Sequence, residues 1–414
     1  MSNKIINQLR KKFNKFQIDG YVIPKNDEFF SEYSQKDRLK TISNFSGSAG
    51  YAIILRKKNY LFVDGRYTIQ AEIESGKYFK VIDYKKILDC KIFKNLTLGI
   101  DPKIFTSDQI KLFFNKNNKI KKIDLNLIDE IFNKYKLNSK SFFSINKNIV
   151  GKSHKNKLKE IFNLIKNSKA NYLFVSAPEN VAWLLNIRGY DNPNSPIPNC
   201  RLILGKNKNI YLFSNKNKIS KIVKEKKFKF IDSSFFEKFI KKLKNKKFII
   251  DPQTCSIKNE SIIRAKNKIV AESDPCYKLK SLKNSSEIKS MLNAHLEDGA
   301  ALTKFIYWIK NKNKKKLTEI DAQKKLEKLR KLNKNYLFPS FNTIAGTGSN
   351  GAIVHYRATK NSNKIIKKKD IFLCDSGGQY KYGTTDVTRT ICFSKQPNSI
   401  KNIFTKVLKG HIAV

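Results

Sequence analysis

Asp375 and Asp386 flank a short glycine-rich stretch of the sequence. An apolar run at 371–374 leads into the first aspartate and is typical of a buried strand. The alternation of apolar and polar residues from Val387 to Phe393 follows the second aspartate and is typical of a return strand. The pattern therefore predicts two adjacent strands with one carboxylate at each of their connected ends.

The stretch between the aspartates contains Gly377, Gly378 and Gly383. Glycine adopts backbone angles that other residues resist, so we predict a hairpin whose turn brings the carboxylates together. Carboxylate oxygens are preferred ligands of hard divalent cations, and such a pair could bridge two ions about 3.5 to 4 Å apart, activating water and holding a carbonyl. The alternative is a polar hairpin in which the aspartates cap turns or pair with Lys381 or Arg389.

Several other segments of the chain resemble the same known family as this hairpin does. The segments Pro339–Ile344 and Gly351–Tyr356, together with the hairpin, closely resemble the pita-bread metallopeptidases, and among them the three-domain aminopeptidase P (Xaa-Pro aminopeptidase) family. Further matching segments follow in the family's order and are Asn44–Gly50, Val63–Tyr67, Ala182–Gly189, Lys283–Ile288, Ala294–His295 and Asp298–Ala300. The resemblance covers essentially the whole chain.

The resemblance implies an α/β (α+β) fold in three parts. Residues 1–142 correspond to a creatinase-like domain I, residues 143–280 to a creatinase-like domain II, and residues 281–414 to the N-terminal part of a pita-bread catalytic domain. A chain of 414 residues is also too long for one ordinary core. A dipeptide shared by the first two parts, Asp101-Pro102 and Asp251-Pro252, is weak evidence that one part repeats the other.

Strand and helix signals alternate through the first two parts, and two helices precede the hairpin. The predicted strands are Gly20–Pro24, Tyr51–Leu55, Tyr60–Val63, Leu98–Asp101, Tyr172–Ser176, Arg201–Leu204, Ile210–Phe213 and Phe248–Asp251. The predicted helices are Tyr67–Ser75, Lys157–Ile165, Glu287–Trp308, with Ser285 or Ser286 as its cap, and Thr318–Lys331. The segment Met1–Phe16 has apolar residues at helical spacing and is expected to dock on the first domain, with membrane-surface association as the alternative.

The chain carries a formal net charge of +50, from 84 lysine and arginine residues against 34 aspartate and glutamate residues. Such a charge would ordinarily indicate binding to nucleic acid or to an anionic membrane surface. The lysines are scattered through all three parts, however, and lysine, asparagine, isoleucine and phenylalanine are enriched together, as in a genome rich in A/T codons. We therefore expect no specific nucleic-acid partner and only nonspecific phosphate affinity at low salt.

Cysteine usage and hydropathy indicate a cytoplasmic protein. Six cysteines are widely spaced without a CxxC pair, so reduced thiols are expected, and they are Cys90, Cys200, Cys255, Cys276, Cys374 and Cys392. The last two lie in apolar strand patterns and are predicted to be core residues. No segment reaches the roughly 20 apolar residues of a membrane span, and the N-terminal segment lacks the apolar run of about 7 to 15 residues that a signal peptide requires.

For the site, the resemblance implies that Asp375 and Asp386 bind two divalent metal ions, with Mn²⁺ as the expected metal. Aspartate oxygens also accept cobalt and zinc, so residue chemistry leaves the metal identity open. His355, which follows Gly351 at the end of a predicted strand, corresponds to a catalytic histidine that contacts substrate and stabilises the reacting carbonyl. The alternative is a histidine whose ring is satisfied by backbone groups.

Arg66 corresponds to a family arginine that reaches the peptide substrate from the first domain. A guanidinium suits a carbonyl or carboxylate there, and a structural ion pair with Asp64 is the alternative. Arg188 is interpreted as a structural residue of the second domain. The remaining histidines are His154 and His295, to which no role is assigned, and His411, which is interpreted as structural.

The resemblance implies a metal-dependent aminopeptidase that removes the first residue from peptides whose second residue is proline. It also implies a homodimer, because relatives are often dimeric. In the family, a histidine and two glutamates nearer the C-terminus complete the metal centre, and they would lie beyond Val414. We therefore expect a truncated version of a longer enzyme, and the activity of this chain is left open. The alternatives are a prolidase and a nonenzymatic pita-bread module that binds protein or nucleic acid.

Overall fold

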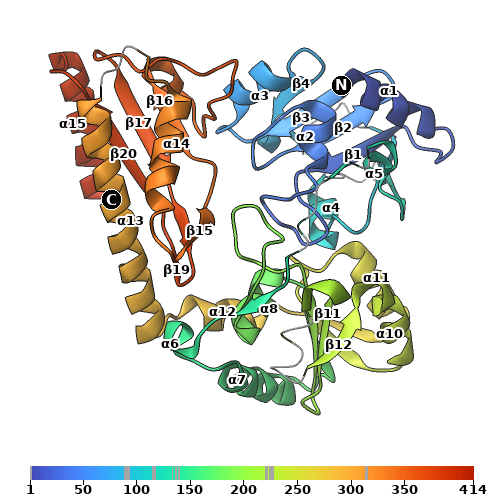
Figure 1. Ribbon diagram of the computed structural model, residues 1–414. Helices are drawn as coiled ribbons and strands as arrows, with labels where there is room; N and C mark the ends of the chain where they lie inside the picture. Colours follow the sequence, from blue (N-terminus) through green and yellow to red (C-terminus); the bar gives the residue numbers. More distant parts are fainter. Residues whose placement is uncertain are drawn as a thin grey trace. The chain divides into compact units, whose positions relative to one another are not determined.

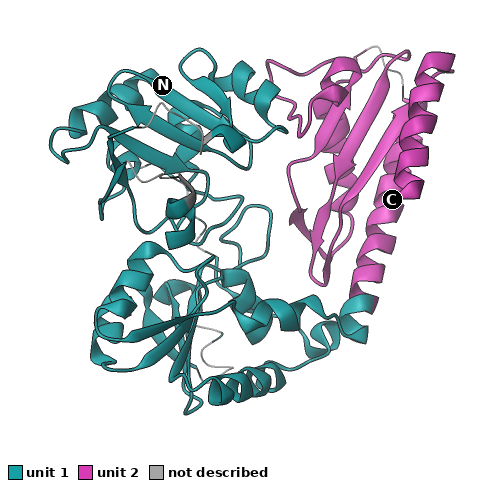
Figure 2. Ribbon diagram, turned by 180° about the vertical axis from the view of Figure 1, so that it is seen from behind, with its two compact units in different colours: residues 1–288 teal, residues 289–414 magenta. Residues whose placement is uncertain are grey.

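The computed structural model describes residues 2–414 except for 88–93, 114–117, 133, 136–137, 139, 220–221, 223–227 and 313–315. The chain forms two compact units, Met1–Ile288 and Lys289–Val414 (Figure 2). Within the described residues, unit 1 contains two six-stranded sheets, and unit 2 contains two three-stranded sheets (Figure 1).

The first sheet of unit 1 has the strand order β4-β3-β2-β1-β5-β6. Its strands are β1 (Gly20–Pro24), β2 (Tyr51–Leu55), β3 (Asn59–Val63), β4 (Lys80–Asp83), β5 (Thr97–Ile100) and β6 (Lys119–Lys122). The helices around it are α1 (Ser2–Lys12), α2 (Arg38–Ser43), α3 (Thr68–Ser75), η1 (Tyr84–Ile87), α4 (Ser107–Phe113) and α5 (Leu127–Ile131). The β1–β2 and β2–β3 pairs are antiparallel, and the β3–β4, β1–β5 and β5–β6 pairs are parallel.

The second sheet of unit 1 has the order β12-β11-β10-β8-β13-β14. Its strands are β8 (Tyr172–Val175), β10 (Arg201–Gly205), β11 (Ile210–Ser214), β12 (Lys229–Asp232), β13 (Lys247–Ile250) and β14 (Lys268–Ala271). Its helices are α6 (Lys147–Val150), α7 (His154–Asn167), α8 (Pro178–Leu185), η2 (Ser233–Phe235), α10 (Phe236–Lys242), α11 (Ile257–Arg264) and α12 (Pro275–Ser281), and β7 (Phe143–Ser144) pairs with β9 (Ile187–Arg188). Every strand pair has the same direction as its counterpart in the first sheet.

The repeated dipeptide marks equivalent places in the two sheets. Asp101 follows β5 and Asp251 follows β13, and each carboxylate accepts a hydrogen bond of 2.9 Å from the backbone two residues later. Five residues beyond each aspartate, Thr106 and Ser256 form a β-bridge with each other. The expectation of a repeat is therefore confirmed, and the two sheet domains contact each other through equivalent residues.

The N-terminal helix α1 packs on the first sheet. Ile5, Ile6 and Leu9 are buried in one apolar cluster with Phe13 and Tyr21 of β1. The helical spacing of these residues places them on one face, so they pack in the core while the exposed lysines of the helix stay in water. The predicted docking of this segment on the first domain is confirmed.

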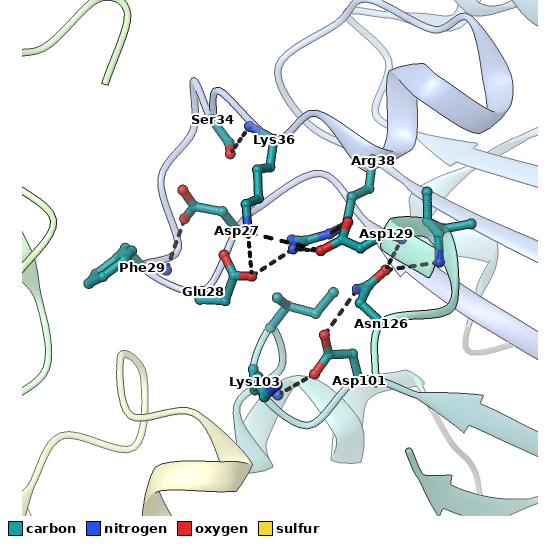
Figure 3. Close-up of polar contacts among 12 residues, drawn as sticks. Asp27, Glu28, Phe29, Ser34, Lys36, Arg38, Asp101, Lys103, Asn126 and Asp129 are labelled. Atoms are coloured by element: carbon teal, nitrogen blue, oxygen red, sulfur yellow. Dashed lines mark hydrogen bonds and ion pairs between the residues drawn. The ribbon is translucent and has the colours of Figure 1, made fainter. Parts of the chain in front are cut away.

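A buried arginine ties the loop after β1 to α5 (Figure 3). The Arg38 guanidinium is 1% exposed and donates to Asp129 Oδ1 at 2.8 Å and Asp129 Oδ2 at 2.7 Å. The same group donates to Glu28 Oε1 at 2.6 Å. Burial alone would raise the pKa of the Glu28 carboxyl, but the charges of Arg38 and Lys36 outweigh it and lower the pKa to about 2.

Unit 2 is built from helices and two small sheets, β16-β17-β20 and β15-β18-β19. The long helix α13 (Ser285–Asn311) runs into it from unit 1. The other elements are α14 (Glu319–Arg330), β15 (Tyr336–Pro339), β16 (Ile344–Thr347), η3 (Gly348–Ala352), β17 (Ile371–Ser376), β18 (Gly378–Tyr380), β19 (Gly383–Thr384), β20 (Val387–Cys392) and α15 (Asn398–Ala413). Apolar side chains of α13 and α14 pack on the β16-β17-β20 sheet, and Phe305, Leu326 and Phe372 are at most 1% exposed there.

Two local expectations for this part of the chain are wrong. The cap of α13 is Asn284, whose Oδ1 accepts from the Glu287 backbone at 3.0 Å while Glu287 Oε2 accepts from the Asn284 backbone at 3.0 Å. Cys374 is buried, but Cys392 is exposed because it is the last residue of the outer strand β20. The described cysteines are free thiols, and Cys90 lies outside the described residues.

Within the described ranges, no helix is both long and apolar enough to cross a membrane.

Glu28→Gln should lower the stability of unit 1 at neutral pH and reduce its sensitivity to acid. A carboxyl whose pKa is lower in the folded state contributes stability above its unfolded value of 4.5 and loses it as the pH falls toward about 2. We expect the free energy of unfolding to fall by roughly 1 to 3 kcal/mol at neutral pH and by less at about pH 3. Urea unfolding followed by circular dichroism measures both values.

The matched control is Glu130→Gln. Glu130 pairs with Lys12 at 2.8 Å on the surface, where both side chains are about one-third exposed. Such a pair contributes about 0 to 1 kcal/mol. A Glu28→Gln effect that does not shrink at low pH would contradict the assignment of this carboxyl as a charged partner of Arg38.

Candidate metal centre

The two aspartates lie at neighbouring ends of paired strands. Asp375 is in β17 and pairs in register with Thr388 of the antiparallel strand β20. Asp386 directly precedes β20, whose first residue, Val387, pairs with Ser376. The strand pairing therefore brings the two carboxylates together.

The connection between these strands differs from the predicted hairpin turn. It contains β18 and β19, which pair with each other and join β15 in a separate sheet. The glycines Gly377, Gly378 and Gly383 do not have left-handed φ angles, so the expectation that they supply unusual backbone angles is wrong. Their small size is what the fold requires. A Cβ on Gly377 would lie 1.9 Å from the Thr385 carbonyl oxygen, and one on Gly383 would lie 2.6 Å from Ala294 Cβ.

The protonation of Asp386 depends on the neighbouring Asp375. The pKa of Asp386 is raised, first by burial and then by the negative charge of Asp375 and a hydrogen bond to it. The charge of His295 acts in the opposite direction. Two carboxylates this close cannot both be charged without repulsion, unless a cation lies between them.

A divalent cation fits this arrangement. Asp375 Oδ1 is buried and has no hydrogen-bond partner in the described part of the molecule. An unsatisfied buried oxygen is costly, and a cation would satisfy it while removing the repulsion between the carboxylates. Among the described residues there is no group of three or more His, Cys, Asp or Glu side chains placed to hold a metal. The centre that these residues can form by themselves therefore has two protein ligands, Asp375 and Asp386.

A buried ion pair fixes the strand next to Asp375. Arg330, at the end of α14, is 1% exposed, and its Nε and Nη2 donate to the two oxygens of Asp298 at 2.7 and 3.0 Å. The same Nη2 donates to Ser376 Oγ at 3.0 Å, and the Tyr380 hydroxyl donates to Asp298 Oδ1 at 2.8 Å. Ser376 follows Asp375 directly, so this network anchors the first aspartate through its neighbour.

A second set of buried contacts fixes the residue before Asp386. Thr385 is fully buried, and its carbonyl oxygen accepts from Ser340 Oγ at 2.8 Å. Its hydroxyl accepts from the Gly378 backbone at 2.9 Å, and its own N–H donates to the Gly378 carbonyl at 2.9 Å. Each aspartate is therefore adjacent to a buried, hydrogen-bonded residue that limits its backbone motion.

His355 lies in a turn, and the expectation of a strand there is wrong. It follows the short helix η3 and has a left-handed backbone, with a φ of 55°. The three glycines and one asparagine at 346–351 favour turns over extended structure, which is why the chain leaves the strand after Thr347. The side chain of His355 is exposed, and that of Tyr356 is buried.

Arg66 forms an ion pair within its own loop of unit 1. Its Nη2 lies 2.7 Å from Asp64 Oδ2, and its Nε lies 3.0 Å from Asp64 Oδ1. This hydrogen bonding is the largest cause of a raised pKa for Arg66. The side chain is 53% exposed, and its guanidinium lies 5.3 Å from the centre of the Tyr67 ring.

The other basic residues are placed as follows. Arg188 Nη1 donates to the carbonyl oxygens of Ala182 and Ile187 at 3.2 and 2.9 Å, as expected for a structural residue. His154 begins α7 and stacks edge-on against Phe228. His411 is exposed on α15.

Sequence reasoning missed three groups beside the centre. His295 was assigned no role, yet its charge acts to lower the pKa of Asp386. Its ring Nδ1 lies 3.0 Å from the Met291 carbonyl oxygen. Arg330 and Asp298 were not recognised as partners, because they are 32 residues apart. A usable signal was present for Asp298, which stands as an acidic residue between apolar positions of a predicted helix.

Three domain families match the chain. Residues 5–131 and 133–287 each match a creatinase/prolidase N-terminal domain, and residues 289–414 match metallopeptidase family M24. The class defined by the fold and the site is therefore an M24 metallopeptidase domain, present in part, preceded by two creatinase-type domains. The predicted fold class is confirmed.

Individual proteins similar to this chain identify its family within the M24 metallopeptidase class. The chain is 31% identical over 442 residues to "Probable Xaa-Pro aminopeptidase P" of Pyrenophora teres f. teres, a match that covers 98% of this chain and 67% of that protein. It is 31% identical over 445 residues to Xaa-Pro aminopeptidase 1 of Dictyostelium discoideum, covering 100% of this chain and 70% of that one. The chain belongs to the Xaa-Pro aminopeptidase P family, as its sequence predicted.

A solved structure has the same fold. X-prolyl aminopeptidase from Caenorhabditis elegans, described as a cytosolic enzyme with a di-nuclear active site, matches with a TM-score of 0.88 and 24% identity. The match covers 96% of this chain and 71% of that one. The chain therefore spans about seven-tenths of the length of this relative.

Removing one partner of the Arg330–Asp298 pair should destabilise unit 2 strongly. Arg330→Met leaves the Asp298 carboxylate buried without its cation, which typically costs about 3 to 5 kcal/mol. The double variant Asp298→Leu/Arg330→Met should lose less than the sum of the two single variants, because neither charge remains. In a Trp183→Phe background, fluorescence of Trp308 during urea unfolding reports on unit 2.

Lys331→Met provides the control, since Lys331 pairs with Glu327 at 3.2 Å while 64% exposed. It should change the free energy of unfolding by less than about 1 kcal/mol. Equal effects of Arg330→Met and Lys331→Met would show that the buried pair does not stabilise unit 2.

Proposed function

We propose that the protein is a metal-dependent aminopeptidase that releases the N-terminal residue from peptides whose second residue is proline. The observation that carries the proposal is the pair Asp375 and Asp386, held side by side with one buried carboxylate oxygen lacking a partner. Membership of the Xaa-Pro aminopeptidase P family supports the reaction. Proline makes the scissile bond a tertiary amide without an N–H, so a dedicated site is reasonable.

Asp375 and Asp386 would hold two divalent metal ions, with Mn²⁺ as the expected metal. When bound, such ions supply an activated water and polarise the scissile carbonyl. The chain's own residues position the two carboxylates, through Ser376 on one side and Thr385 on the other. These hydrogen bonds keep the two carboxylates close together. Without a bound cation, the raised pKa of Asp386 disfavours the state in which both carboxyl groups are charged.

His355 would contact the substrate and donate a hydrogen bond to the reacting carbonyl. Its side chain is exposed on a turn, so a ligand can reach it without rearrangement of the core. Arg66 would contact the peptide from the first domain, and its exposed guanidinium keeps N–H groups beyond those used by Asp64. We also propose a cytosolic location, like that given for the C. elegans relative, and a homodimer.

The full-length protein supplied with Mn²⁺ should release the first residue from an Xaa-Pro-Yaa tripeptide. Mass spectrometry of the products measures the cleavage, and the same sequence with alanine in place of proline is the matched substrate. Cleavage of Xaa-Pro dipeptides in place of the tripeptide would make the protein a prolidase. Absence of cleavage together with a salt-sensitive gel shift of single-stranded nucleic acid would favour a nonenzymatic binding module.

Asp375→Asn and Asp386→Asn should each weaken Mn²⁺ binding by roughly tenfold or more, because each removes a negatively charged oxygen ligand. Electron paramagnetic resonance of free Mn²⁺ measures the binding by the chain itself. Asp370→Asn is the control, because Asp370 lies in the same unit and accepts from Thr347 Oγ1 at 3.1 Å. Mn²⁺ binding that survives both aspartate substitutions would exclude this pair as the metal site.

A further inference from the structure

Unit 2 contains a buried carboxylate whose hydrogen-bond donors, among the residues that the structure describes, are all uncharged. Glu319, the first residue of α14, is 0% exposed. Its Oε1 accepts from the Thr347 backbone at 2.8 Å, and its Oε2 accepts from the Lys364 backbone at 3.0 Å. The Asn350 amide nitrogen lies 3.0 and 3.1 Å from the two oxygens. The Tyr356 hydroxyl donates to Oε2 at 2.8 Å.

These donors come from both ends and from the middle of one segment, 347–364. The two backbone donors, Thr347 and Lys364, stand where the segment leaves and rejoins the fold. The Glu319 backbone also donates to the Lys364 carbonyl oxygen at 3.1 Å, so this end is held twice. One carboxylate therefore closes the whole loop.

His355 lies within this loop and has a backbone conformation that needs support. A left-handed φ costs a residue other than glycine roughly 1 to 2 kcal/mol, and it persists only where the surroundings impose it. The next residue, Tyr356, is 6% exposed and is held by Glu319 and by the Ser362 carbonyl oxygen, 2.9 Å from its hydroxyl. Its backbone N–H also donates to the Ile353 carbonyl at 3.1 Å, which closes the turn around His355.

The place of Glu319 in α14 suits a carboxylate. Thr318 caps the helix and forms a capping box with Asp321, so Glu319 lies in the first turn, where the helix dipole favours negative charge. The four donor groups satisfy both oxygens, which removes most of the cost of burying them. The side chain is thus suited to remain in one conformation.

We propose that Glu319 is a positioning residue for His355, acting through Tyr356 and the loop 347–364, an inference that rests on the catalytic role proposed above for His355. Glu319 does not contact the substrate. It holds the left-handed turn so that the imidazole is presented in one orientation.

The test follows the four histidines of the chain by NMR after labelling their ring Cε1 with ¹³C. Tyr356→Phe removes only the hydroxyl that joins the turn to Glu319. Tyr336→Phe is its matched control, because it removes a tyrosine hydroxyl bonded to a different glutamate of the same unit, Glu327, at 2.6 Å. His355→Gln identifies the His355 signal.

In Tyr356→Phe and in Glu319→Gln, the His355 signal should shift and broaden or split, while the signals of His154, His295 and His411 stay in place. Tyr336→Phe should leave the His355 signal unchanged. An unchanged His355 signal in Tyr356→Phe would overturn the proposal, and this variant decides the outcome if Glu319→Gln does not fold.

In the full-length enzyme, both variants should lower kcat on an Xaa-Pro peptide by roughly tenfold to a hundredfold, with a smaller change in KM, because a misplaced group costs most in the transition state. The NMR result stands apart from this measurement. A shifted His355 signal with no peptide cleavage by any form would refute the proposed function and leave the positioning role intact.

Discussion

The ion pair between Arg330 and Asp298 is the interaction on which unit 2 depends. It joins the last residue of α14 to the middle of α13, and through Ser376 and Tyr380 it reaches both β17 and β18. Burying two charges is favourable only when their geometry is good and their remaining hydrogen bonds are made, and here each oxygen of Asp298 accepts a guanidinium bond. The pair therefore specifies how two helices and two sheets meet beside Asp375.

Helix α14 carries a buried charge at each end, and each charge holds a different segment of unit 2. Glu319 begins the helix and Arg330 ends it, so both are favoured by the helix dipole. The first holds the loop of His355, and the second holds the strand of Asp375. A helix of twelve residues is a rigid spacer of about 18 Å, so it links the two regions without flexible intermediates.

The sequence predicted the inner strands well because their residues are continuously apolar, as in β1 (Gly20–Pro24) and β8 (Tyr172–Val175), where apolar side chains pack on both faces of the sheet. The outer strand β6 was missed because its residues, Lys119 to Lys122, are mostly lysine and only partly buried. The two aspartates were found because carboxylates beside glycines form a local pattern. Arg330 and Glu319 were not found, since what defines them is contact with residues tens of positions away, which local spacing does not encode.

The β-bridge between Thr106 and Ser256 joins residues that occupy the same place in each repeat. The contacts beside the bridge follow the same relation. Ser107 Oγ donates to Glu260 Oε2, and the residues at the corresponding places of the other repeat, Ile257 and Ile110, pack in one apolar cluster. Contacts between identical places are the signature of a two-fold axis, which arises when two copies of one chain associate. The two halves of unit 1 therefore meet as the subunits of a symmetric dimer do, although both belong to one chain, so a substitution at one of these places faces an unaltered counterpart in the other half.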